Sequence, residues 1–321
     1  MKQTFVGIDV ASADFVVAYV SSDNAIKKKS YNNTSMGIKS FLKSLDTSSW
    51  CIMEATGVYS INLALAIHQQ GFKVSVVNPL QIKRFAQTKL KRTKTDSVDA
   101  DLIAEYGQRM QPVEYDPPAE YIRHLHQQRT TLKLLVKTKC SITNQLRGLG
   151  HIKDIDKDAV KACKAVIAAL SVQITKLESE MEILVLTHCK VLFEQLQTIP
   201  GISKKTSIEL IIVSGAFKNF NSAKQFLAFI GICPCINESG SSIRGYKGIS
   251  RVGDSYIRAS LYMCSMIAKV SNQACKELFD RMVLADKPKK VALLAVMNKL
   301  IKQVFGMVNS GNLYMENLNV A

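Results

Sequence analysis

The sequence lacks any run of roughly 18–20 uninterrupted apolar residues, the length that a membrane-spanning helix needs. Its first residues, Met-Lys-Gln-Thr-Phe-Val-Gly-Ile-Asp9, place an acid inside what would be the apolar core of a signal peptide. We therefore expect neither a membrane-spanning protein nor a secreted one. The expectation is a cytoplasmic protein with no membrane partner.

Acidic residues are scarce compared with basic ones. The chain has 26 Asp and Glu but 42 Lys and Arg, which gives a formal net charge of +16 and a pI of about 9.4. Such an excess favours a polyanionic partner, a nucleic acid or an anionic membrane surface, although an ordinary basic enzyme has the same charge. With 321 residues, 47% of them hydrophobic, the chain has enough apolar material for two domains and is not mainly disordered.

Paired metal-binding cysteines are also missing. The eight cysteines are scattered, and only Cys233 and Cys235 stand close together. No second pair of cysteines or histidines lies at the spacing of zinc ligands, so reduced thiols are favoured over a zinc site.

The first third of the chain has the pattern of an α/β domain. Strand-like runs occupy 5–10, 15–20, 28–31, 50–53 and 73–77, and helical patterns occupy 35–45 and the stretch between Gly57 and Gly71. Three antiparallel strands followed by helix, strand, helix and strand is the order of a ribonuclease H-like domain, in which strand ends converge on one edge. We predict such a domain over residues 1–115.

Four acids in this region carry the chemistry that we expect. Asp9 and Glu54 end two of the apolar runs, whereas Asp96 and Asp99 stand three residues apart at the start of a helical pattern, on one helix face. Hard cations such as Mg²⁺ take carboxylate oxygens as ligands, and two ions can activate both oxygens of a phosphodiester exchange. Each acid alone is weak evidence, because Asp96 could simply cap the helix. Asp101 lies on a different face and is left out.

A basic run precedes the acidic pair. Residues 83–94 contain six Lys and Arg and no acid. This run predicts a nucleic-acid contact beside the metal site, with a solvated helix face as the alternative.

The middle of the chain is helical. A seam with 3-4 spacing is formed by Val160, Cys163, Ile167, Leu170, Ile174, Leu177, Met181 and Leu184. Such a heptad pattern is typical of a coiled coil, and a second apolar helix precedes it at about 119–149. We predict an antiparallel helical hairpin over 116–190, which either packs on itself or pairs between subunits into a dimer or tetramer.

Residues 191–321 predict a mostly helical domain. The Leu196–Thr206 stretch, with Ile-Pro-Gly-Ile at its centre, has the pattern of a helix-hairpin-helix whose backbone N–H groups meet a DNA phosphate. Pro-Gly also marks ordinary turns, so that alternative stays open. A Gly/Ser-rich loop is expected at 237–248, and further helices at about 254–270 and 288–308.

This loop contains three serines, Ser239, Ser241 and Ser242, among glycines and basic residues. A serine here could act as a nucleophile on phosphorus and form a phosphodiester with DNA. Composition by itself favours a solvated surface loop.

Several short motifs occur together in a characteristic order. They are Gly-Ile-Asp9-Val-Ala, Glu54-Ala-Thr-Gly, Lys-Thr-Asp96-x-x-Asp99-Ala, Ile-Pro-Gly-Ile, Pro234-x4-Ser239-Gly240 and Ile-Ser250-x-x-Gly253-Asp254-x-Tyr-Ile-Arg258. Over nearly the whole chain this resembles the DEDD transposases of the bridge-RNA-guided insertion-sequence family, which also contains the Piv-type DNA invertases.

The resemblance implies a RuvC-like N-terminal domain, a central coiled coil and a C-terminal transposase domain with a catalytic serine. It implies that Asp9, Glu54, Asp96 and Asp99 bind Mg²⁺ and that Ser239 is the nucleophile, with Ser241 and Ser242 as neighbouring alternatives. The expected activity is cleavage and rejoining of DNA strands of an insertion element, guided by a non-coding RNA that pairs with donor and target DNA.

Other functions remain open from the sequence. A site-specific invertase of the same family would use the same residues. A Holliday-junction-type nuclease would need only the four acids. A sugar-kinase-like or actin-like ATPase shares the Gly-Ile-Asp strand but needs Gly-rich phosphate loops that this sequence lacks. An inactive nucleic-acid-binding scaffold would not need all four acids.

Overall fold

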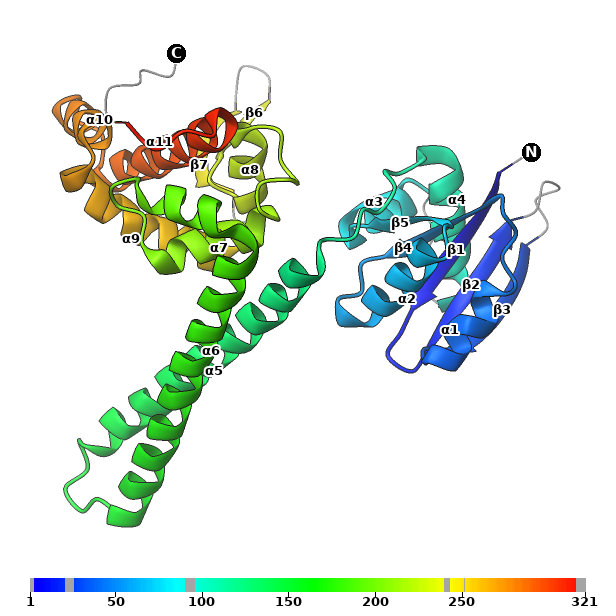
Figure 1. Cartoon of the computed structure of the whole chain (residues 1–321), viewed down its shortest axis with the longest axis horizontal. Coiled ribbons are helices and arrows are strands. Elements are labelled where there is room, and N and C mark those ends of the chain that lie inside the picture. Colours follow the sequence, from blue (N-terminus) through cyan, green and yellow to red (C-terminus); the bar gives the residue numbers. More distant parts are fainter. Residues whose placement is uncertain (1–2, 21–25, 90–95, 240–242, 251, 316–321) are drawn as a thin grey trace. The chain divides into compact units, whose positions relative to one another are not determined.

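The computed structural model describes residues 3–20, 26–89, 96–239, 243–250 and 252–315. The chain divides into two compact units, Met1–Pro117 and Pro118–Ala321, and each is described by itself (Figure 1).

The N-terminal unit is built on a five-stranded mixed sheet. Its strands are β1 (Thr4–Val10), β2 (Asp14–Val20), β3 (Ile26–Asn32), β4 (Ser49–Glu54) and β5 (Lys73–Val77), in the order β3-β2-β1-β4-β5. The first three strands are antiparallel, whereas β4 and β5 run parallel to β1. This arrangement confirms the predicted ribonuclease H-like α/β fold.

Helices cover both faces of this sheet. One apolar cluster joins even-numbered residues of β1, such as Val6 and Ile8, to α1 (Ser35–Leu42) and α2 (Val58–Gln69). The other joins Phe5, Trp50 and Ile52 to α3 (Pro79–Thr88) and α4 (Asp96–Met110). Because side chains alternate across a strand, both faces of β1 and β4 are buried, which explains their continuous apolar runs.

Glycines let α4 lie directly on the sheet. A Cβ atom on Gly7 of β1 would overlap the Ala100 carbonyl oxygen and lie 2.8 Å from Cβ of Ala104. Farther along the helix, a Cβ on Gly107 would overlap Ile52. It would also lie 3.3 Å from Phe5, which precedes Gly7 in β1, so α4 runs antiparallel to β1 and begins over its carboxyl end.

The C-terminal unit starts with the expected helical hairpin. Helices α5 (Glu120–Leu149) and α6 (Lys157–Gln197) lie side by side (Figure 1). The seam positions from Val160 to Leu177 are only partly buried, whereas Met181 is 2% exposed. The predicted boundary at 190–191 falls inside α6, beside a break in helical geometry at Cys189, and the three-domain division stays a prediction.

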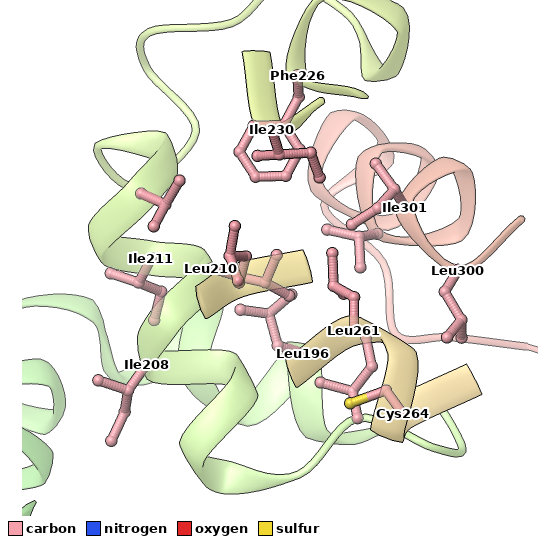
Figure 2. Close-up of a cluster of buried hydrophobic side chains, with 14 of the residues drawn as sticks. Leu196, Ile208, Leu210, Ile211, Phe226, Ile230, Leu261, Cys264, Leu300 and Ile301 are labelled. Carbon is pink, nitrogen blue, oxygen red and sulfur yellow. The ribbon is translucent and has the colours of Figure 1, made fainter. Parts of the chain in front are cut away.

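Five further helices surround the main core of this unit. They are α7 (Lys204–Ser214), α8 (Ala223–Ile230), α9 (Ser255–Ser271), α10 (Gln273–Leu284) and α11 (Lys289–Ser310). Figure 2 shows side chains from α6, α7, α8, α9 and α11 converging, among them Leu196, Ile211, Phe226, Leu261 and Ile301. Each of these five side chains is fully buried.

Helix α11 is the one helix in the described chain that is long and apolar enough to cross a membrane, with a mean hydropathy of 1.5. Half of that window is buried inside the unit, where Val296, Leu300 and Val304 have no exposed surface. Core helices of globular proteins have the same composition, and α11 is packed as one. Lys299 and Lys302 interrupt its apolar sequence.

One sequence expectation for this unit needs correction, and one helix was missed. The predicted loop at 237–248 is wrong, because Pro234–Ser239 (β6) and Ile243–Ile249 (β7) pair as a two-stranded antiparallel hairpin. Glycine and serine gave this stretch the composition of a loop, but backbone pairing between its two halves makes it regular. Helix α10 was not predicted, since its short pattern lies next to that of α9.

Candidate active site

Asp9 and Glu54 end up side by side at one edge of the sheet. Ile8 of β1 pairs with Met53 of β4 in parallel register, so the next residues along, Asp9 and Glu54, lie at the same level of neighbouring strands. Side chains alternate between the two faces of a strand, so Asp9 lies on the same face as Phe5, and Glu54 on the same face as Ile52. Both acids are partly buried. The two carboxylates therefore share the α3/α4 face of the sheet.

The start of α4 brings the third acid to this edge. Ala100 lies over Gly7. Asp9 is two residues farther toward the carboxyl end of β1, so it lies roughly 7 Å from Gly7 along the strand. Because α4 runs antiparallel to β1, its first turn lies over that end, and Asp99 belongs to this turn. Asp96 is the first residue of α4, but its side chain lies outside the described residues.

The donor set consists of carboxylate oxygens, which suits a hard divalent cation. Among the described side chains, no three His, Cys, Asp or Glu form a group that could hold a metal ion. The Asp96 side chain is not among those described. Two residues after Glu54, the Thr56 hydroxyl oxygen is buried with no hydrogen-bond partner in the described chain. Such an unsatisfied oxygen costs free energy unless something binds it, and sequence reasoning did not single out Thr56.

Asp101 has a structural role instead. Its carboxylate lies 2.7 Å from the Lys28 ammonium group, which ties α4 to the edge strand β3. The acidic set without Asp101 stays a prediction.

The basic run at 83–94 is described only as far as Lys89. Lys83 and Arg84 are exposed on α3. Lys89 pairs with Glu105 of α4, which also lies 3.0 Å from Arg109. The described part of the run therefore combines exposed cations with one that joins two helices, and the predicted nucleic-acid contact stays a prediction.

Ser239 is the last residue of β6 and pairs with Ile243 of β7, so it stands at the tip of the hairpin. Its side chain is outside the description, as are residues 240–242 with Ser241 and Ser242. The structure therefore locates the backbone of Ser239 without testing which serine reacts.

The base of this hairpin is held by close backbone contacts. The Ser250 N–H donates to the Cys233 carbonyl at 3.0 Å, and the Arg258 guanidinium donates to the Ile230 carbonyl at 2.8 Å. Gly231 and Gly253 have φ angles of +77° and +109°, and a Cβ on either would overlap a carbonyl oxygen. Only glycine combines a positive φ angle with the absence of a Cβ atom that these close contacts require.

A buried ion network connects α5, α7 and the start of α9. Arg129 of α5 places Nε 2.6 Å from Glu209 of α7 and Nη2 2.7 Å from Asp254, while the Lys133 ammonium lies 3.3 Å from Asp254. The Nη2 contact has the distance of an ion pair but not the geometry of a hydrogen bond. Asp254 also caps α9 by accepting from the Tyr256 N–H at 2.9 Å.

This network sets the charge state of Asp254. Partial burial opposes its ionisation, but the contact with Arg129 and the nearby positive charges outweigh burial and lower the pKa of Asp254 to about 2. Burial raises the pKa of Glu209 despite its contact with Arg129. Sequence reasoning missed Arg129 and Glu209, which are 80 residues apart in the chain.

A short turn joins α6 to α7 where the sequence predicts a helix-hairpin-helix. Gly201 turns the chain with a φ of +102°, and the Ser203 side chain caps α7. Lys204 and Lys205 lie 2.8 Å from Glu182 and Glu178 of α6, yet both lysines remain exposed. The DNA-phosphate contact expected here stays a prediction.

The seven cysteines whose side chains are described are free thiols, and Cys51, Cys264 and Cys275 among them are buried. Burial raises the pKa of Cys275 to about 12.

Comparison with known proteins agrees with this architecture. The family model of the DEDD transposases of IS110, described as a transposase, matches residues 6–150, which include all four acids. The model described as the transposase IS116/IS110/IS902 family matches residues 193–280, which include the β6–β7 hairpin.

Similar proteins match most of the chain. The pilin gene-inverting proteins of Moraxella lacunata and Moraxella bovis are each 29% identical over 96% of this chain and 96% of their own length. The transposase for insertion sequence element IS1328 of Yersinia enterocolitica is 23% identical over 82% of this chain and 83% of its own. With both family models matched in order on the expected folds, the chain belongs to the IS110 family of transposases, enzymes that cut and transfer DNA strands.

Proposed function

We propose that this protein recombines DNA by combining an acidic metal site with a serine nucleophile. Asp9, Glu54, Asp96 and Asp99 would form the metal site, and Ser239 the nucleophile, with Ser241 and Ser242 as neighbouring alternatives. The observation that carries the proposal is the meeting of the carboxyl ends of β1 and β4 with the first turn of α4. The tip position of Ser239 on the β6–β7 hairpin supports it.

Membership of the DEDD group implies use of a divalent metal ion. We propose Mg²⁺, because the four proposed ligands are all carboxylates. When bound, the ion would neutralise charge on the phosphate oxygens. The protein would hold the four acids at one sheet edge, and the close contact of Gly7 with α4 supports this role.

The serine chemistry proceeds in two balanced exchanges. The Ser239 oxygen forms a bond to the scissile phosphorus while the bond from phosphorus to the 3′ oxygen breaks, and the serine proton ends on that 3′ oxygen. The 3′-hydroxyl of another strand then forms a bond to the same phosphorus. That second exchange breaks the phosphoserine bond and returns a proton to the serine, so no external energy source is consumed.

We propose DNA as donor and target, with a non-coding RNA as the guide. We also propose a dimer or tetramer formed through α5 and α6, because their seam is only partly buried within one chain and Leu134 and Val172 are more than 60% exposed. A cytoplasmic location remains part of the proposal.

Inversion rather than transposition is a specific second candidate. The relatives named as pilin gene-inverting proteins match more of this chain, at higher identity, than the IS1328 transposase does. Either outcome would use the same acids and serine, and a Holliday-junction-type nuclease would use the acids only.

A denaturing gel separates serine recombination, by inversion or by transposition, from the nuclease alternative. Purified full-length protein is incubated with Mg²⁺, labelled DNA carrying the element ends and the RNA transcribed beside the gene. A covalent protein–DNA adduct is expected with wild type, none with Ser239→Ala, and strand exchange should fall at least about 10³-fold for Ser239→Ala and Asp9→Asn.

Matched serine variants provide the control. Ser241→Ala and Ser242→Ala should keep the adduct, and loss in one of them instead would move the nucleophile to that position. Free DNA ends without any adduct would favour the nuclease, and full recombination by Asp9→Asn would contradict the metal site.

A further inference from the structure

A charged groove on the C-terminal unit lies outside the proposed catalytic residues. It runs between α10 and α11 and encloses a cavity of about 490 Å³. Lining residues recur every three or four positions on both helices, so the groove follows the helix pair for about two turns, roughly 10 Å. Ala274 and Ala295 stand in its walls, where their small side chains leave space between the helices.

Positive charge dominates this groove. Arg281 lines it from α10, and Lys299 and Lys302 line it from α11, against a single acid, Glu277. Arg281 and Lys302 are exposed and Lys299 is partly buried. None of the three cations takes part in an ion pair recorded among the described residues, whereas Glu277 accepts a hydrogen bond from Gln273 at 2.8 Å.

An amide pair joins α10 to α11 at one end of the groove. Asn272, at the junction of α9 and α10, is fully buried and caps α10 by accepting from the Cys275 N–H. Its side chain exchanges hydrogen bonds of 3.0 and 3.2 Å with Gln303 of α11. Gln303 also donates to the Tyr314 hydroxyl, so the first turn of α10 is fastened to α11. A preformed site avoids the entropic cost of ordering its walls on binding.

We propose that this groove binds the phosphodiester backbone of a nucleic acid, DNA or RNA. A strand lying along it meets Arg281 on one wall and the two lysines, one helical turn apart, on the other. Arginine offers a planar fork and lysine a compact ammonium group, which are the two side chains that bind phosphate oxygens. No aromatic residue lines the groove, so bases find nothing to stack on and binding is independent of sequence.

This inference rests on the proposed action on nucleic acid, but its test does not require catalysis. Full-length protein and the triple variant Arg281→Gln, Lys299→Gln, Lys302→Gln are compared by fluorescence anisotropy on random-sequence duplex DNA and on single-stranded RNA. The measured quantity is the slope of log affinity against log salt between roughly 50 and 200 mM. We expect the magnitude of the slope to fall by about 0.9 for each lost phosphate contact on duplex DNA and by about 0.7 on single-stranded RNA. Removal of all three cations should therefore lower it by about 2–3.

A second triple variant has the same change of charge elsewhere in the protein. Lys73→Gln, Lys176→Gln, Lys190→Gln removes lysines that lie beside Glu114, Glu180 and Glu194. Its slope should fall by less than about 1, because those lysines are already neutralised by acids. Circular dichroism melting of both variants checks that the unit remains folded.

The groove assignment is overturned if the groove variant keeps the wild-type slope or if both variants lose the same amount. It is also overturned if only binding to vesicles of anionic lipid or to a poly-glutamate peptide is weakened. Loss on DNA alone or on RNA alone supports the groove and identifies which nucleic acid occupies it. Strand exchange by Asp9→Asn would contradict the proposed metal site, whereas the groove test compares salt slopes of binding and does not depend on that outcome.

Discussion

The two units hold their helices and strands in position by different physical means. In the N-terminal unit, the backbone does the positioning: parallel strand ends bring Asp9 and Glu54 level, and Gly7 lets α4 lie on the sheet. In the C-terminal unit, buried side-chain charges do it, since Arg129 joins α5, α7 and the start of α9 through Glu209 and Asp254.

This difference follows from the available secondary structure. A sheet fixes its strand ends by register, so a short polar residue at a strand end is placed without further contacts. A helical unit has no such register, and specific polar contacts between helices can supply one. Removal of a buried charge should therefore destabilise the C-terminal unit, whereas addition of a methyl group at a close backbone contact should destabilise the N-terminal unit.

The strongest test of the comparison removes the charge that organises the C-terminal unit. Arg129→Met leaves Glu209 and Asp254 partly or fully buried without their partner, and breaking such a pair costs about 3–5 kcal/mol. Urea unfolding of the full chain, followed by hydrogen exchange of peptides from α7 and α9, measures the loss. Lys176→Met removes an exposed lysine beside Glu180 and should cost less than about 1 kcal/mol. Equal effects would show that the buried network does not organise this unit.

A smaller loss is expected from one methyl group in the N-terminal unit. Gly7→Ala forces a Cβ into the Ala100 carbonyl and should cost about 1–3 kcal/mol, because α4 must move away from β1. Metal-dependent strand cleavage should fall with it, since the first turn of α4 carries two of the acids. The control is Gly148→Ala in α5, where nothing lies within 4 Å and a gain of about 0.5–1 kcal/mol is expected. A tolerated Gly7→Ala with full cleavage would contradict positioning by close packing.

The smallest expected effect concerns pH. The pKa of Asp254 is lowered from 3.8 to about 2, so its ionised form contributes stability above about pH 4 that is lost as pH falls toward 2. Asp254→Asn keeps a good N-cap but removes the charge. Its stability should be about 1–2 kcal/mol below wild type at pH 6, and the gap should close by pH 2. A gap independent of pH would mean that capping, rather than the charges of Arg129 and Lys133, holds the start of α9.

The elements that could be predicted are those with a local signal. Continuous apolar runs ending in Asp9 and Glu54 identify buried parallel strands, and the 3-4 spacing from Val160 identifies α6. The β6–β7 hairpin could not be predicted, because its two strands pair only with each other and their glycines and serines resemble a loop. The Arg129–Glu209 pair could not be predicted either, since no local pattern links residues 80 positions apart.

For this protein, the sequence alone determined the order of elements, the excess of positive charge, and the acids and serines that the family resemblance identifies. Those properties depend on residue type and on spacing within one strand or one helix turn. The tertiary structure decided the levels at which the acids lie, because strand register places Asp9 beside Glu54 and the contact of Gly7 with Ala100 sets the level of α4 on the sheet. It also separated Asp101, which pairs with Lys28, from the acids at the sheet edge, and it created the groove of Arg281, Lys299 and Lys302 by packing two helices that are separate in the chain.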